Sequence, residues 1–494
     1  MVDVRILVPP TAMPAWGWLV AVAVSGLINE VAVQRGLGQP SAPQTAAKVP
    51  SQNEQPGAPG SLRAGVARRN VTPPLYVPYL TSSGKGTHAP FQAVHDHLVA
   101  RALVLDDGRR SLALVTVDSI GYDNAILGPG RNFTGELRQR ISAQTGLSPD
   151  AIMLAATHTH QAPETIGLTP FRSVPGVPEW LETHLQDLVA VVVEAWQNRV
   201  PVQVFAGSVP VAGIGRNRRI VLKDGTSSRH GPVPTPEQVG KPFFVDEDLA
   251  VICFAKEGGV PHAVLLNYTA HPVVTMLLPS VSADYCGELC RYVEDRLPGA
   301  TCLFTQGADG NINSQMVSTS FDDAHLLGER LGTAAVAETQ RQLARQESQH
   351  ATDVQWQREE VVLEPRDCPP LAEIERTADE KPTASNLQLL RLARKLAEGP
   401  IRGEVQLMGV GDVRWVSLPG EPFVETGLAL KKAGARFIVG YANGYVGYLP
   451  IRSAYADGGY ETGPGVWSRV APGSAERLEA VGRKLLSATR AGSP

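Results

Sequence analysis

The sequence has no cluster of Lys and Arg, and no segment repeats at a fixed period. Lys and Arg number 45 against 49 Asp and Glu, which gives a formal net charge of −4. Because nucleic acids are bound through clustered basic side chains, we expect no nucleic-acid partner. The lack of a repeat argues against solenoid and propeller architectures. Neutral polar or apolar small molecules, including lipids, remain open as substrates.

Cysteine is scarce as well. The chain has five cysteines in 494 residues, which is an odd number in a chain too long to be a scaffold of disulfides. Cys286 and Cys290 could lie on one helix face, but no second pair has the spacing of a zinc site. We therefore expect the cysteines to be small, buried, apolar side chains, with a disulfide as the alternative.

The apolar segment 14–28 (PAWGWLVAVAVSGLI) is shorter than the ~20 residues that a membrane-spanning helix needs. It follows Arg5 and ends near small residues, which is typical of a signal peptide or an N-terminal anchor. A mis-assigned start or a plain apolar leader is the alternative. Segment 34–61 is rich in Pro, Gln, Ala, Ser and Gly, as in a disordered linker. We expect a leader over 1–33, a linker over 34–61, one large catalytic domain over 62–494, and a secreted, periplasmic or envelope-anchored location.

Apolar runs typical of strands alternate with helical patterns from residue 62 onward. The predicted strands are 62–71, 97–105, 111–117, 151–156, 202–210, 249–254, 263–268, 301–305, 413–418 and 437–441. The predicted helices are 132–144, 180–196, 284–297, 322–345, 387–398 and 423–433. This alternation predicts an α/β fold with mixed sheets flanked by helices.

Four of the predicted strands end in polar, turn-rich motifs: THTH, TAHP, QGADGN and PGEP. In α/β folds, ligands and catalytic groups gather in the loops that follow the carboxyl ends of strands. The sequence therefore predicts that these four motifs meet in one functional site.

Three histidines and one glutamate in these motifs could bind a metal ion. His158 and His160 are two residues apart at a strand end, so their side chains point to the same side. His271 and Glu421 follow two other strands. Imidazoles and a carboxylate suit zinc, which would lower the pKa of a bound water toward ~7. The alternative is structural: hydrogen-bonded loop histidines and a carboxylate that caps a helix.

Short motifs follow one another in a characteristic order between Leu62 and about Pro464. They read AGVARRNVTPP, ARALVLDDG, LALVTVD, ATHTHQAP, NRR, VDEDLAVICF, NYTAHP, SADYCGEL, TQGADGN, LPGEP and YANGYVGYLPIRSAYADGGYE. In this order they resemble the catalytic domain of the neutral/alkaline (non-lysosomal) ceramidase family. The resemblance covers roughly four-fifths of the chain.

The resemblance implies one bound Zn²⁺ and a set of site residues. The family's zinc ligands correspond to His158, His271, Glu421 and Tyr448. His160 lines the same pocket, and Tyr460 stands where the family has a Tyr that can hydrogen-bond the substrate carbonyl or the developing oxyanion. Asp118 and Asp284 stand where a carboxylate could orient a ligand histidine; Asp284 suits a helix N-cap equally well.

The sequence departs from the family at two points. The family has a Ser that attacks or assists at the amide, and Asn313 occupies that position here, with Ser314 beside it. Asn313 can donate a hydrogen bond but is no ordinary nucleophile. The family also has an immunoglobulin-like domain after the catalytic one, and we expect none here because the chain ends at Pro494, soon after the Tyr-rich loop.

Taken together, the site residues and the resemblance imply a zinc-dependent hydrolase. It would cleave an N-acyl (amide) bond in ceramide or a ceramide-like lipid with zinc-activated water, and His160, Tyr460 and Asn313 would be its catalytic residues. An alternative is a hydrolase with the same site that cleaves an ester, a lactone or a glycoconjugate linkage. The Asn at position 313, where the family has a Ser, favours this alternative. A second alternative is a protein that binds without catalysis. A lipid substrate would imply peripheral contact with a membrane.

Overall fold

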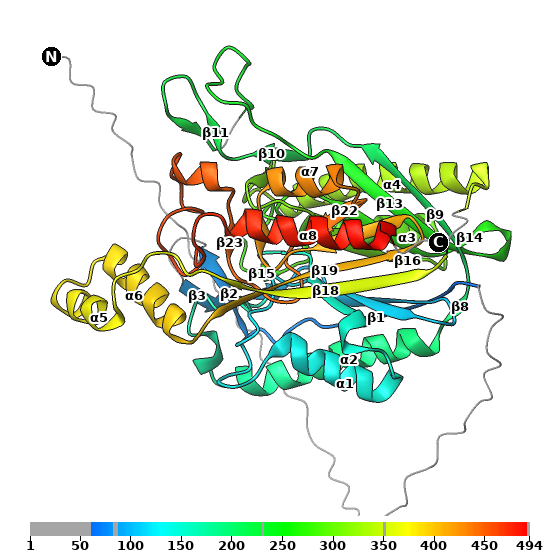
Figure 1. Cartoon of the computed structure of the whole chain (residues 1–494), viewed down its shortest axis with the longest axis horizontal. Coiled ribbons are helices and arrows are strands. Elements are labelled where there is room, and N and C mark those ends of the chain that lie inside the picture. Colours follow the sequence, from blue (N-terminus) through cyan, green and yellow to red (C-terminus); the bar gives the residue numbers. More distant parts are fainter. Residues whose placement is uncertain (1–60, 83–86, 230–231, 349–351, 492–494) are drawn as a thin grey trace, which may run out of the picture. The chain divides into compact units, whose positions relative to one another are not determined.

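Three mixed β-sheets pack around one apolar core in the computed structural model (Figure 1). The structure describes residues 61–82, 87–229, 232–348 and 352–491, which all fall in one compact unit. The predicted leader lies outside the described residues, and so does the predicted linker apart from Ser61.

The first sheet has the strand order β7-β6-β5-β1-β8. Its strands are β1 (Arg63–Asn70), β5 (Val99–Asp106), β6 (Ser111–Val117), β7 (Ile152–Ala156) and β8 (Val200–Pro201). β6 and β7 run parallel, whereas the other neighbours run antiparallel. Both faces of this sheet are buried. Successive side chains of a strand point to opposite faces, so Val104 packs toward the helices, whereas Leu103 and Leu105 pack into the central core.

The other two sheets repeat this plan with four strands each. The second has the order β16-β14-β13-β9, with β9 (Gln203–Pro210), β13 (Asp248–Lys256), β14 (Val260–Tyr268) and β16 (Thr301–Gln306). The third has the order β18-β19-β20-β22, with β18 (Val354–Leu363), β19 (Ile401–Val410), β20 (Val413–Ser417) and β22 (Phe437–Val439). Each contains one parallel pair, β14 with β16 and β20 with β22.

Helices cover the outer face of each sheet. The first sheet packs on α1 (Phe133–Thr145) and α2 (Val177–Gln197), and the second on α3 (Asp284–Arg296) and α4 (Phe321–Arg345). The third packs on α7 (Val424–Lys432) and α8 (Ser474–Ala491). In Figure 1, α1 and α2 lie along the lower edge and α4 along the upper edge. The predicted α/β class with mixed sheets flanked by helices is confirmed.

Smaller elements connect these layers. Two-stranded ladders pair β2 (Pro78–Ser82) with β3 (Thr87–Pro90), β4 (Ala93–Val94) with β15 (Ser280–Val281), β10 (Gly215–Asn217) with β17 (Ile312–Ser314), β11 (Ile220–Val221) with β12 (Ser227–Ser228), and β21 (Glu421–Pro422) with β23 (Tyr448–Leu449). Helices α5 (Leu371–Glu380) and α6 (Ala384–Ala397) form a hairpin with its own apolar cluster, at the left of Figure 1.

One parallel strand pair brings two of the polar motifs together, because parallel neighbours end at the same edge of a sheet: β14 and β16 both end there. THTH follows β7, TAHP follows β14, QGADGN follows β16 and PGEP follows β20. Backbone hydrogen bonds then join the three sheets at these ends: Ala156 N donates to Tyr441 O at 3.3 Å, and Gly440 N donates to Gln306 O at 2.9 Å.

The predicted strands and helices are present with small shifts of their ends. Among the longer elements the prediction omitted β18, β19, α5 and α8, and it also omitted β8 and the short strands of the two-stranded ladders. β18 and β19 carry charged residues such as Glu360 and Glu404 between their apolar ones, so neither forms a continuous apolar run. The cysteine prediction is confirmed, since all five are free and all but Cys368 are buried. Within the described part of the chain, no helix combines the length and apolarity needed to cross a membrane.

Candidate metal centre

Three histidine side chains meet where the first and second sheets end. His158 and His160 follow β7, His271 follows β14, and one ring nitrogen from each lies within 4.8 Å of the others. All three side chains are buried. His158, His160 and His271 therefore form one buried cluster that could hold a metal ion.

Hydrogen bonds fix the orientation of two of these rings. His158 Nδ1 donates to the carbonyl oxygen of Ile120 at 2.6 Å, and His271 Nδ1 donates to the carbonyl oxygen of Asp309 at 2.8 Å. Because a carbonyl oxygen only accepts, each Nδ1 carries a proton, and the neutral His158 ring keeps a lone pair on Nε2. His158 Nε2 lies 3.3 Å from His160 Nε2. Such second partners are typical of histidines that bind metals.

Glu421 brings a carboxylate to the same point from the third sheet. Its Oε2 lies 3.2 Å from His271 Nε2 and 3.8 Å from His158 Nε2. Its Oε1 accepts a hydrogen bond from the Tyr445 hydroxyl at 2.5 Å. The helix-cap alternative does not hold, because Phe423 is the N-cap of α7 and no side chain caps that helix. Glu421 therefore presents one oxygen to the imidazoles.

The electrostatics of the centre favour a cation. Burial alone would raise the pKa of Glu421, but the neighbouring imidazoles outweigh burial and lower the pKa to about 2. Burial holds the pKa of His158 well below its usual range and lowers that of His160 to about 3. The ionised carboxylate thus faces two neutral imidazoles, those of His158 and His160. The pKa of His271 is different: despite burial, Asp309 and Glu421 raise it to about 9, so a metal ion would have to displace a proton from this ring. This donor set fits a bound divalent ion.

Tyr448 lies next to Glu421 in the structure. β21 and β23 run parallel with Glu421 opposite Tyr448. The Tyr448 hydroxyl accepts a hydrogen bond from Arg218 Nη2 at 3.1 Å, and the residue is buried. The register therefore brings Tyr448 beside the carboxylate, and its role as a ligand stays a prediction.

The backbone is strained at the centre. His158 has φ 68° and Tyr441 has φ 53°, both in the left-handed region that bulky residues rarely adopt. The Tyr441 ring stacks on the His158 ring with centroids 3.8 Å apart, and its hydroxyl donates to the Asp309 carboxylate. Strain of this kind persists where the surrounding structure holds a functional group in place.

Arg218 is a site residue to which the sequence analysis assigned no role. Its guanidinium donates to Asn313 Oδ1 at 2.7 Å and to the Gly310 carbonyl oxygen at 2.6 Å, besides Tyr448. Its Nε also pairs with Glu461 Oε1 at 3.1 Å. These partners are distant in sequence, so the NRR motif was the one available signal. Arg218 links the Asn313 loop to the Tyr448 loop.

The two remaining predicted site residues lie around Arg218. The Tyr460 ring meets the Tyr448 ring edge-on with centroids 5.7 Å apart, and Arg218 Cζ lies 5.3 Å from its centroid. Burial raises the pKa of Tyr460 to about 12. Asn313 is buried, and its oxygen is taken up by Arg218. The structure thus gathers His160, Asn313 and Tyr460 around the centre.

The expectation that Asp118 and Asp284 orient a ligand histidine is wrong. Asp118 Oδ2 instead accepts from Arg101 Nη1 at 3.1 Å, and Asp284 Oδ2 accepts from the hydroxyl of Thr275 at 2.8 Å. Asp284 is no N-cap either, because Ala283 holds that position in α3. The groups that orient His158 and His271 are the Ile120 carbonyl oxygen and Asp309, and backbone acceptors leave no signal in a sequence.

Solved structures of ceramidases resemble this chain over most of its length. None of the known family models matches the sequence, and no curated protein does. Neutral ceramidase from Pseudomonas aeruginosa superposes with a TM-score of 0.67 at 19% identity, covering 88% of this chain and 75% of the other. A ceramidase complexed with C2 gives a TM-score of 0.67 at 17% identity, covering 88% and 76%. The chain therefore has the fold of the neutral ceramidase catalytic domain, as the motifs implied.

Proposed function

We propose that this protein is a zinc-dependent hydrolase that cleaves the N-acyl bond of ceramide or a ceramide-like lipid. The convergence of His158 Nε2, His271 Nε2 and Glu421 Oε2 carries the proposal. The fold supports the substrate class, because a protein with this fold is known complexed with C2 and named a ceramidase. On this proposal the enzyme is secreted or held at the cell envelope and touches membranes peripherally.

The proposed zinc ligands are His158, His271, Glu421 and Tyr448. Two imidazoles and a carboxylate suit a borderline ion such as zinc better than a hard ion such as Mg²⁺, and zinc binding would displace the Nε2 proton of His271. When bound, zinc lowers the pKa of a water molecule and polarises a carbonyl oxygen.

His160 is suited to move a proton. Its Nδ1 is buried and has no hydrogen-bond partner among the described residues. Burial lowers the pKa of His160 to about 3, so the imidazole is neutral near pH 7 and, being a weak base, would hand on a proton rather than keep it. In our proposal the ring transiently receives the proton from the attacking water and passes it to the leaving amine.

Tyr460 and Asn313 are suited to stabilise the oxyanion. The raised pKa of Tyr460, about 12, keeps its hydroxyl protonated near neutral pH, so it can donate a hydrogen bond. Arg218 donates a hydrogen bond to Asn313 Oδ1, so the side-chain NH₂ group of Asn313 can donate a hydrogen bond to the oxyanion.

The nucleophile in this proposal is water. Asn313 has no nucleophilic atom, and the neighbouring Ser314 hydroxyl donates to the carbonyl oxygen of Met316 at 2.6 Å. The second candidate function follows from the same observation. A site that activates water next to an oxyanion donor also suits an ester, lactone or glycoconjugate linkage, whose leaving group needs less help than an amine.

The experiment compares matched substrates on the full chain loaded with zinc. We expect release of fatty acid from a fluorogenic short-chain ceramide, loss of release with a chelator, and recovery on adding zinc. His158→Ala should be inactive. His325→Ala, which removes a histidine with 61% of its side chain exposed, is the matched control and should be fully active. Cleavage of the corresponding ester alone would favour the second candidate, and chelator-resistant cleavage would refute both.

A further inference from the structure

Tyr445 is the hydrogen-bond donor that holds Glu421. Its hydroxyl donates to Oε1 at 2.5 Å, whereas Oε2 faces the imidazoles of His271 and His158. Tyr445 and Glu421 are both buried. Tyr445 therefore decides which carboxylate oxygen is presented to a metal ion.

Arg469 in turn holds Tyr445. Its Nη1 donates to the carbonyl oxygen of Tyr445 at 3.3 Å, and its Cζ lies 5.6 Å from the centroid of the Tyr445 ring. The other donors bind Val466 O at 2.7 Å and Ile166 O at 3.1 Å. With 5% of its side chain exposed, Arg469 is a buried cation that ties three backbone segments together around Tyr445.

Asp123 supplies the opposite charge. Its Oδ2 lies 2.9 Å from Arg469 Nη1 and 3.0 Å from Lys395 Nζ, and its Oδ1 accepts from Ala125 N. Burial would raise the pKa of Asp123, but the charges of Arg469 and Lys395 outweigh it and lower the pKa. Asp123 is therefore ionised, as a partner for a buried guanidinium must be.

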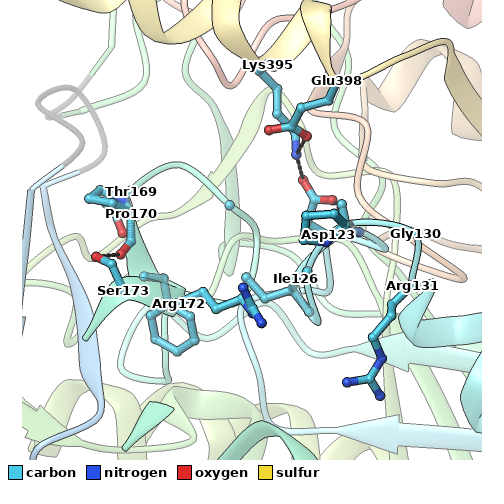
Figure 2. A pocket seen from close by; sticks show the side chains of 15 residues that line it. Asp123, Ile126, Gly130, Arg131, Thr169, Pro170, Arg172, Ser173, Lys395 and Glu398 are labelled. Atoms are coloured by element: carbon cyan, nitrogen blue, oxygen red, sulfur yellow. Dashed lines mark hydrogen bonds and ion pairs between the residues drawn. The ribbon is translucent and has the colours of Figure 1, made fainter. Parts of the chain in front are cut away.

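The far end of this chain of contacts opens to a cavity. Figure 2 shows Lys395 reaching from α6 to Asp123 at the edge of a cavity of about 780 Å³, lined mainly by segments 123–131 and 167–173. Lys395 also pairs with Glu398 at 2.6 Å, and 16% of its side chain is exposed. The contacts thus run from the surface helix α6 through Asp123, Arg469 and Tyr445 to Glu421.

We propose that Tyr445, Arg469 and Asp123 are positioning residues that hold Glu421 in its metal-binding orientation, an inference that rests on the proposed zinc site. Each residue constrains the next: Asp123 fixes the guanidinium, the guanidinium fixes the Tyr445 backbone and ring, and the hydroxyl fixes the carboxylate. Partners of metal ligands are worth about 10–100-fold in metal affinity. The effect should therefore decline with each step away from Glu421.

Zinc affinity of the full chain, measured by competition with a chromophoric chelator, tests the first step. Tyr445→Phe removes only the hydroxyl and should weaken zinc binding about 10–100-fold. It should also change the visible spectrum of the Co²⁺-substituted protein, because the orientation of a ligand changes. Tyr455→Phe is the matched control: this hydroxyl donates to the Val470 carbonyl oxygen at 3.3 Å, and affinity and spectrum should match the parent.

Two further variants test the gradient. Asp123→Asn should weaken zinc binding about 3–10-fold, and Lys395→Met, which leaves the Asp123–Arg469 pair in place, by about twofold at most. Unfolding midpoints of the zinc-free proteins separate positioning from stability, because lost stability alone would not alter the Co²⁺ spectrum. If the parent binds zinc and the Tyr445→Phe variant has the same zinc affinity and Co²⁺ spectrum, this inference is wrong but the proposed function stands. A parent that binds no zinc overturns the proposed function and this inference together.

Discussion

Replacing Arg218 with Met should damage stability and catalysis by separable amounts. The variant removes a buried cation from Glu461, Asn313 and Tyr448 and leaves the Gly310 carbonyl oxygen without this donor. Breaking a buried ion pair from one side costs about 3–5 kcal/mol. Glu461 keeps Arg219 at 2.7 Å, so we expect the low end, about 3 kcal/mol of unfolding free energy.

The loss of rate has a different origin. Arg218 orients the Asn313 amide and contacts the Tyr448 hydroxyl, so its removal frees one proposed oxyanion donor and one proposed ligand. Loss of one oxyanion donor costs about 10²–10³ in turnover. Burial raises the pKa of Tyr448 well above its usual range, and the positive charge of Arg218 opposes that rise. Without Arg218 the Tyr448 hydroxyl would lose its proton less readily, so zinc binding should weaken too.

Arg219→Met is the matched control. Arg219 shares Glu461 and donates to the carbonyl oxygens of Ala454 and Gly458, but among the described residues it forms no hydrogen bond with Asn313 or Tyr448. Both variants would be compared by urea unfolding and by turnover at saturating zinc. Both should lose stability, whereas only Arg218→Met should lose about 10²-fold or more in turnover. Turnover of Arg218→Met within twofold of Arg219→Met would refute this account of Arg218.

Three further predictions concern other residues. His158→Ala should lose both zinc, measured by elemental analysis, and activity; full activity in zinc-free protein would contradict the site. Tyr460→Phe should keep its zinc but lose about 10²–10³ in turnover, and a change in zinc content instead would make Tyr460 a ligand. Burial raises the pKa of Glu164 to about 7, so the folded chain binds this proton more tightly than the unfolded chain. Its stabilising effect is complete below the usual carboxyl pKa and is lost as pH rises toward 7, by about 3 kcal/mol in all. Glu164→Gln should remove that slope in urea unfolding, and parallel curves for variant and parent would contradict it.

Much of the site could be predicted because its residues stand at the ends of strands. His158, His271 and Glu421 each follow an apolar strand, and functional groups of α/β folds gather in the loops after the carboxyl ends of strands. That logic requires only local patterns. The meeting of three sheets was not predictable in this way, because bonds such as Ala156 N to Tyr441 O join residues far apart in the chain.

The errors have the same cause. Asp118 stands at a strand end like the histidines, but its charge is satisfied by Arg101 on the neighbouring strand β5. Arg218 lacks any strand-end pattern and acquires its role from partners such as Glu461, 243 residues away. Strand β19 contains Gly403 and Glu404, and becomes a strand through its long antiparallel pairing with β18. Tertiary partners, which single segments do not encode, decide each case.

The most direct test of the central claim is the zinc content of the purified full chain, measured beside His271→Ala. The account predicts about one zinc per chain in the parent, the stoichiometry of a single catalytic site, and almost none in the variant, because His271 Nε2 and Glu421 Oε2 lie 3.2 Å apart and would share the ion. Absence of zinc from the parent after incubation with the metal, or undiminished zinc in His271→Ala, would contradict it.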